Sequence, residues 1–162
     1  VQLLFVNLVT DSFPALCLGM EPPEPDVMSS PCKSRHHAIF SFSSLFEIIT
    51  QGMFLGSLAL TAYLIGGSTM CFAVLSLSQL VHSFNLRSHH SLLETGLFGN
   101  KKLVLSFLLC ATLQCLVVAL APLQSIFHTQ SLSGIQWAIV WLLSLLPVVL
   151  VELQKYFNKD LI

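Results

Sequence analysis

Four residues near the start of the chain combine oxygen-bearing side chains with a proline. Asn7, Thr10, Asp11 and Pro14 lie in an otherwise apolar stretch that runs from residue 1 to about residue 20. Because Asn7, Thr10 and Asp11 are three and four positions apart, an α-helix would place them on one face. Amide, hydroxyl and carboxylate oxygens are the ligands that hard cations such as Ca²⁺ prefer. The segment therefore predicts part of a cation-binding site.

The depth of Asp11 and the position of Pro14 favour this interpretation over a structural one. Asp11 falls near the middle of the apolar stretch, where a bilayer penalises an ionised carboxylate unless it is paired, hydrated or coordinated. Pro14 has no N–H, so the carbonyl of Thr10 loses its helical partner. Broken helices with free carbonyls at mid-membrane are a common basis for transport sites. The alternative is a polar cluster that joins helices, which Asn and Thr alone would favour.

The composition places these residues in a membrane protein. Hydrophobic residues make up 54% of the 162 residues and charged residues only 9%, whereas about 25% of a soluble domain is charged. The mean hydropathy of +0.80 agrees. A chain with so few charges is expected to contact the lipid bilayer. It also contains no basic block, so we expect no nucleic-acid partner.

Five apolar stretches approach or reach the length of about 20 residues that a helix needs to cross a bilayer. They predict an all-α fold, a polytopic membrane helix bundle whose first helix is broken near Pro14. The tripeptide Gly66-Gly67-Ser68 is a turn signal that makes the second and third helices an antiparallel hairpin. The predicted helices cover about residues 1–20, 40–65, 69–84, 103–123 and 135–153.

The basic residues indicate the orientation of the bundle. With five helices, the segments on one side of the membrane hold all seven Lys and Arg residues, and the two loops on the other side hold none. Cytoplasmic loops are enriched in Lys and Arg, so we predict an integral, multi-pass protein with a cytosolic C-terminus. The seven basic residues are Lys33, Arg35, Arg87, Lys101, Lys102, Lys155 and Lys159.

The first 28 residues resemble a known family. The sequence N-L-V-T-D-S-F-P-A at residues 7–15, followed by E-P-P-E-P-D-V-M at residues 21–28, is similar to the sixth transmembrane helix and following loop of P-type cation-transporting ATPases. The similarity is greatest to the calcium-pump branch, which has an N-L-x-T-D core before a P-P-x-x-D-I-M loop. The rest of the chain resembles the last five transmembrane helices of that family in pattern, so the resemblance covers essentially all residues.

This resemblance implies part of an ATP-driven pump that cycles through an aspartyl-phosphate. The positions that match Asn7, Thr10 and Asp11 would supply oxygen ligands to the transported ion, which we expect to be Ca²⁺, with Mn²⁺ as the alternative. ATP and Mg²⁺ would act in upstream domains, because the D-K-T-G-T and T-G-E motifs are absent, so we do not expect the isolated chain to be catalytic. Its expected partners are the bilayer and the upstream helices and cytosolic domains of the same pump, in the plasma membrane if the organism is a bacterium.

Two departures from the family pattern affect the site. Ser12 stands where a glycine usually follows the aspartate, so the conformational freedom of glycine is absent there. Gln79 occupies the position of a glutamate that completes a second calcium site in two-ion pumps, and glutamine keeps an oxygen but no charge. We therefore expect one ion per cycle, with Asn7 and Asp11 as the stronger ligands. For Gln79 we favour a packing role over direct ligation.

The motif Gly52-x-x-x-Gly56 lies in the second predicted helix. Glycines at this spacing let membrane helices approach closely, although glycine is common enough in such helices for the spacing to arise by chance. In the family that the chain resembles, this helix packs on the span that precedes the five present here.

Two other functional classes are left open by the sequence. One is a self-sufficient five-helix channel or secondary transporter that uses Asp11, for which internal repeats would be expected. The other is a non-transporting membrane interaction module, in which the polar face of the first helix serves assembly.

Overall fold

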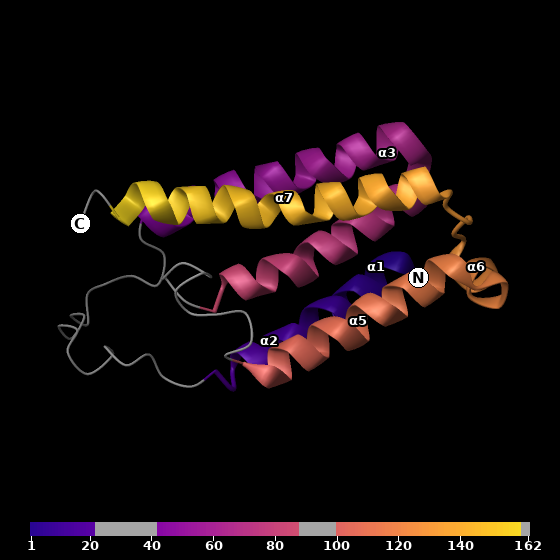
Figure 1. Ribbon diagram of the computed structural model, residues 1–162, viewed down its shortest axis with the longest axis horizontal. Coiled ribbons are helices and arrows are strands. Elements are labelled where there is room, and N and C mark those ends of the chain that lie inside the picture. The colour runs from indigo at the N-terminus through magenta and orange to yellow at the C-terminus, as the bar shows by residue number, and fades with distance from the viewer. Residues whose placement is uncertain (22–41, 88–99, 160–162) are drawn as a thin grey trace.

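The computed structural model describes residues 1–21, 42–87 and 100–159, and within these ranges every regular element is a helix. The predicted all-α fold is therefore confirmed. In chain order, the elements are α1 (Gln2–Phe5), η1 (Val6–Asp11), α2 (Ser12–Leu18), α3 (Phe42–Asn85), α5 (Lys101–Ala119), α6 (Ala121–Phe127) and α7 (Gly134–Lys159). Figure 1 shows α7 beside α3, and α1 and α2 beside α5. The proline-rich segment that follows the first helix lies outside the described residues.

The long element α3 consists of two arms joined at two glycines. Gly66 has φ −139° and ψ 17°, and Gly67 has φ 70° and ψ −161°, so both leave the helical conformation. The dihedral angles of Gly67 lie in a region that essentially only glycine occupies, because it has no Cβ. The two arms run in opposite directions (Figure 1), as the turn signal at residues 66–68 predicts.

We expect Gly67→Ala to weaken this hairpin. A Cβ at φ 70° strains the backbone, and such conformations cost non-glycine residues about 1–3 kcal/mol. The apparent melting temperature of the purified protein in detergent should therefore fall by several degrees. Gly134→Ala is the matched control, because Gly134 starts α7 and a Cβ there meets no atom within 4 Å. Equal melting temperatures for the two variants would contradict the role of Gly67.

The fourth predicted helix is divided in two. The sequence predicts one helix over about residues 103–123, but α5 and α6 are separated by an extended Leu120 with φ −89° and ψ 123°. Pro122 explains the break, because its ring would clash with the carbonyl of Val118 and it has no N–H to donate to that carbonyl. The Val118 carbonyl instead accepts a hydrogen bond from Nε2 of Gln124 at 2.7 Å.

The largest group of buried side chains joins α3, α5 and α7. It consists of Leu58, Ala62, Met70, Ala73, Val74, Leu77, Leu80, Cys110, Ala111 and Val140. The first helix packs onto the bundle by burying Val6, Thr10 and Pro14, which are four positions apart and form one stripe. This stripe determines which side of the first helix faces away from the bundle.

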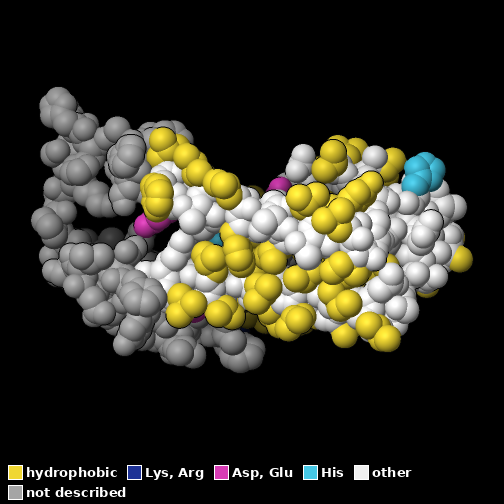
Figure 2. Space-filling model, turned by 90° about the horizontal axis from the view of Figure 1, so that it is seen from above, with side chains coloured by type: hydrophobic (Ala, Val, Ile, Leu, Met, Phe, Trp, Pro, Cys, Tyr) yellow, Lys and Arg dark blue, Asp and Glu magenta, His cyan; other side chains and the backbone are white. Residues whose placement is uncertain are grey.

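Three of the described helices are long and apolar enough to cross a membrane: Leu45–Asn85, which includes the hairpin, Lys101–Ala119 and Gly134–Lys155. The first helix, Gln2–Leu18, is apolar but shorter. Figure 2 shows hydrophobic side chains over much of one face and few charged ones, and many large hydrophobic residues of these helices are exposed. The chain is therefore an integral membrane protein that crosses the bilayer several times.

Four basic residues lie at one end of the bundle. They are Arg87, Lys101, Lys102 and Lys155. The first follows the end of α3, the next two begin α5, and the last lies near the end of α7. The ammonium of Lys155 donates to the carbonyl of Asn85 at 3.0 Å, which joins two of these helix ends. Lys33, Arg35 and the side chain of Lys159 lie outside the described residues.

Candidate cation-binding site

The first helix is widened just before its proline. Between α1 and α2, residues 6–11 form the π-helix η1, in which each N–H bonds the carbonyl five residues back instead of four. Pro14, the third residue of α2, cannot donate the α-helical hydrogen bond to the carbonyl four positions before it. The break predicted near Pro14 is therefore present as a π-helical stretch. Such stretches are frequent at functional sites.

Asn7 and Asp11 are exposed on this stretch, whereas Thr10 faces the bundle. The side chain of Thr10 is only 1% exposed, and its hydroxyl donates to the carbonyl of Val6 at 2.8 Å. The expectation that all three polar residues share one face is therefore wrong for Thr10. A π-turn contains more residues than an α-turn, so side chains three positions apart diverge while those four apart stay nearly aligned.

The hydroxyl of Ser12 supports the widened stretch. It donates to the carbonyl of Asn7 at 3.0 Å, much as the Thr10 hydroxyl donates to Val6. Ser12 itself has helical dihedral angles, φ −68° and ψ −42°. At the position where the resemblance predicts a glycine, Ser12 therefore accompanies a helix that is widened but not unwound.

Asn7 and Asp11 form an exposed polar surface on the first helix, which we call the Asn7–Asp11 surface. Within residues 1–21, 42–87 and 100–159, no three His, Cys, Asp or Glu side chains lie close enough to hold a metal ion. The neighbouring Leu4 and Leu8 are 67% and 63% exposed. A bare carboxylate between leucines is costly in a bilayer. The surface is therefore a candidate half-site, which would need further ligands from outside the described residues to hold a cation.

Gln79 lies in the second arm of α3 and is half-buried. Its Oε1 atom is buried and has no hydrogen-bond partner in the described part of the chain. Leaving a buried acceptor unpaired is unfavourable, so this oxygen requires a donor or a cation from another source. Nothing in its hydrogen bonding connects Gln79 to the Asn7–Asp11 surface.

A polar cluster that the sequence analysis missed lies at the other end of α2. Oε1 of Glu21 accepts hydrogen bonds from Nε and Nη2 of Arg87 at 3.1 and 2.8 Å, and Oε2 accepts one from Nδ2 of Asn100 at 2.5 Å. Burial alone would raise the pKa of Glu21, but these hydrogen bonds and the Arg87 charge outweigh it and hold the pKa below its ordinary value. Asparagine directly before an apolar helix is a capping signal, which could have indicated a role for Asn100.

The comparison with known proteins identifies the family. A family model described as "Cation transporting ATPase, C-terminus" matches residues 1–157. The chain belongs to this family. The prediction made from the first 28 residues is therefore confirmed.

Similar proteins of this ATPase family carry calcium-specific names. The chain is 37% identical over 186 aligned positions to calcium-transporting ATPase 1 of Bacillus cereus. It is 33% identical over 160 positions to a calcium-transporting ATPase of Bacillus subtilis, and 28% identical over 214 positions to one of Plasmodium falciparum. The alignments cover 99%, 93% and 98% of the chain but only 21%, 18% and 17% of the relatives. The chain thus spans about a fifth of their length.

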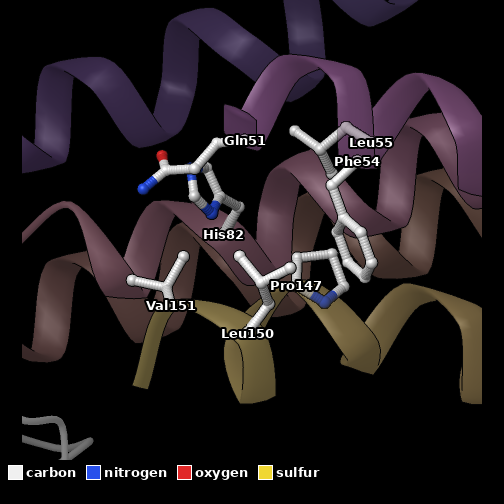
Figure 3. A pocket seen from close by; sticks show the side chains of 7 residues that line it. All are labelled: Gln51, Phe54, Leu55, His82, Pro147, Leu150 and Val151. Carbon is white, nitrogen blue, oxygen red and sulfur yellow. The ribbon is translucent and has the colours of Figure 1, made fainter. Parts of the chain in front are cut away.

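A crevice in this ATPase segment lies between the two arms of α3 and α7 (Figure 3). Its lining residues are Gln51, Phe54, Leu55, His82, Pro147, Leu150 and Val151. Nδ1 of His82 is buried and lacks a hydrogen-bond partner among the described residues. None of the seven lining side chains is a carboxylate, so the crevice does not offer the charged oxygens that a hard cation prefers.

Proposed function

We propose that this chain forms part of the ion path of an ATP-driven calcium pump and supplies ion ligands from its first helix. The observation that carries the proposal is the exposed Asn7–Asp11 surface on a π-helical stretch of an apolar helix in a membrane protein. A cation bound there would stabilise a carboxylate that lipid would not. Family membership and the calcium-specific names of the relatives support Ca²⁺ as the ion.

The two exposed residues have different roles in this half-site. Asp11 supplies a charged oxygen and Asn7 a neutral one. Thr10 contributes less, because its hydroxyl already bonds the helix backbone. Ca²⁺ takes six to eight oxygen ligands, so most of them come from helices outside this chain. Mn²⁺ also suits carboxylate and carbonyl oxygens and is the alternative cargo.

The number of ions per cycle follows from Gln79 in this proposal. An amide at that position carries no charge, so it does not provide the second carboxylate that a two-ion pump would use. We therefore infer one ion per cycle. The half-buried side chain of Gln79 then acts in packing.

We also propose an energy source for the pump and an orientation of the helix bundle in the membrane. ATP and Mg²⁺ would act in phosphorylation and nucleotide-binding domains upstream, and the partners of this chain would be those domains, the upstream helices and the bilayer. The basic end of the bundle, with Arg87, Lys101 and Lys102, would face the cytosol together with the C-terminus. In a bacterium, the membrane would be the plasma membrane.

The proposal can be tested in membrane vesicles that contain the full-length calcium pump of which we propose this chain to be a part, here called the longer pump. We expect ATP-dependent uptake of radioactive calcium together with calcium-dependent phosphorylation, and competition by Mn²⁺ measures the ion preference. Vesicles with this chain alone are the control and should show neither activity. Ion flux through the isolated chain without ATP would favour a channel or secondary transporter. A longer protein that moves no ion under any of these conditions would favour an interaction module.

A further inference from the structure

The carboxylate of Glu21 joins three helix ends. Glu21 lies three residues after the end of α2. Arg87, just after α3, donates two guanidinium N–H groups to one of its oxygens. Asn100, just before α5, donates an amide N–H to the other oxygen. One side chain thus uses both oxygens to hold the end of α2 against the neighbouring helices.

Asn100 also bonds α2 directly. Its Nδ2 donates to the carbonyl of Cys17, in the last turn of α2, at 3.1 Å. Its Oδ1 accepts hydrogen bonds from the backbone N–H groups of Lys102 and Leu103 at 3.1 and 3.0 Å, the pattern of a helix N-cap. Because one side chain both starts α5 and bonds the end of α2, these helix ends cannot separate without loss of a hydrogen bond.

The Glu21–Arg87–Asn100 cluster is largely shielded from water. The side chain of Arg87 is 2% exposed and that of Glu21 is 18% exposed. Charge-assisted hydrogen bonds of a guanidinium have a defined geometry, and a buried charge that loses its partner is strongly unfavourable. The cluster therefore restricts the orientation of α2 as well as its distance from α3 and α5.

The rest of the first helix is held by its buried apolar stripe and by contacts at its other end. At the opposite end, Nε2 of Gln2 donates to the carbonyl of Phe127 at 2.8 Å, and the ring of Phe5 lies edge-on to that of Phe127 at 5.3 Å. Between the two ends, η1 presents the exposed Asp11. Only α2 and a short turn separate Asp11 from Glu21, so a rotation of α2 turns the Asp11 carboxylate with it.

We propose that Arg87 and Asn100 are positioning residues for the ion site. By holding Glu21, they set the rotation of α2 and thereby the direction in which Asp11 points. This inference rests on the proposed calcium transport. The affinity of a metal site depends on groups that orient its ligands. Loosening the cluster should therefore weaken calcium binding more than it reduces the number of folded pumps.

Calcium titration of phosphorylation in the longer pump separates these two effects. For Arg87→Leu and Asn100→Asp, we expect the half-saturating calcium concentration to rise roughly 10-fold or more. The phosphoenzyme level at saturating calcium should stay close to that of the unmodified pump. Asn100→Asp keeps an acceptor that caps α5 but sets a second carboxylate against Glu21. Lys102→Gln is the control, because its exposed ammonium contacts only the sulfur of Met20, at 3.6 Å, in the described part of the chain.

A paired exchange gives an independent test. Combining Glu21→Gln with Asn100→Asp restores the hydrogen bond between positions 21 and 100 with donor and acceptor exchanged, but not the bond from position 100 to the Cys17 carbonyl. We expect this double variant to regain part of the calcium affinity that Asn100→Asp alone loses. A fall in phosphoenzyme level without a shift in half-saturation, or no recovery in the double variant, would overturn the positioning role. Absence of calcium-dependent phosphorylation in the unmodified pump would instead reject the proposed function.

Discussion

Asp11→Asn in the longer pump is expected to abolish calcium-dependent phosphorylation at low calcium concentrations. The substitution keeps the size of the side chain and one oxygen but removes the charge. Loss of one partner from a buried charge pair costs about 2–5 kcal/mol. At about 1.4 kcal/mol per factor of ten, the calcium affinity should fall roughly 30-fold to several thousand-fold. The measurements are the calcium dependence of phosphoenzyme formation and ATP-driven uptake into vesicles.

Thr112→Val provides the matched control for this experiment. Thr112 is an exposed polar residue within α5, and its hydroxyl bonds the carbonyl of Leu108 in the same helix at 2.7 Å. Asp11→Asn removes a charge and Thr112→Val removes a hydroxyl, so both make an exposed position of an apolar helix less polar, and a general effect on membrane insertion would appear in both variants. Transport by Asp11→Asn at the rate of the unmodified pump would contradict the assignment of Asp11 as a ligand.

Gly56→Leu is expected to disturb the assembly of the longer pump while leaving the fold of this chain intact. Gly52 and Gly56 are exposed on the first arm of α3, and a Cβ at either position meets no atom within 4 Å. Glycines at this spacing accept a second helix at close range, which we propose to be the preceding span of the pump. Overpacking such a contact costs about 1–3 kcal/mol.

The thermal stability and calcium uptake of the longer pump measure this effect, and the melting temperature of the isolated chain is the internal reference. Thr61→Leu is the control, because Thr61 is also exposed on the first arm. At about 100° per residue, it lies far around the helix from Gly56. A lower melting temperature in the longer pump for Gly56→Leu alone is the expected result. Unchanged stability and transport in that variant would show that the glycines face lipid.

Local features of the sequence were sufficient to predict that the chain is a membrane protein, which family it belongs to, and where its helical hairpin turns. The scarcity of charge requires lipid contact wherever the chain folds. The turn at Gly66 and Gly67 depends on residues next to each other, and only glycine accepts the dihedral angles found there. The break at Pro122 is equally local and could have been predicted, because the missing N–H and the ring clash act within one turn.

The tertiary structure determined which polar residues are available to an ion. Thr10 shares its spacing with Asn7 and Asp11, but the packing of the first helix on the bundle buries it. Sequence spacing assumes a regular α-helix, so it could not predict the rotation that the π-helical stretch introduces.

The Glu21–Arg87–Asn100 cluster was likewise invisible in the sequence. Glu21 and Arg87 are 66 positions apart, and Glu21 and Asn100 are 79 apart. No periodicity links residues at such separations, and only the packing of α2 against α3 and α5 brings them together. The sequence by itself thus determined that Asn7 and Asp11 are candidate ligands in a membrane helix. The tertiary structure showed that they are exposed and what holds their helix in place, because burial and long-range contacts depend on how helices pack.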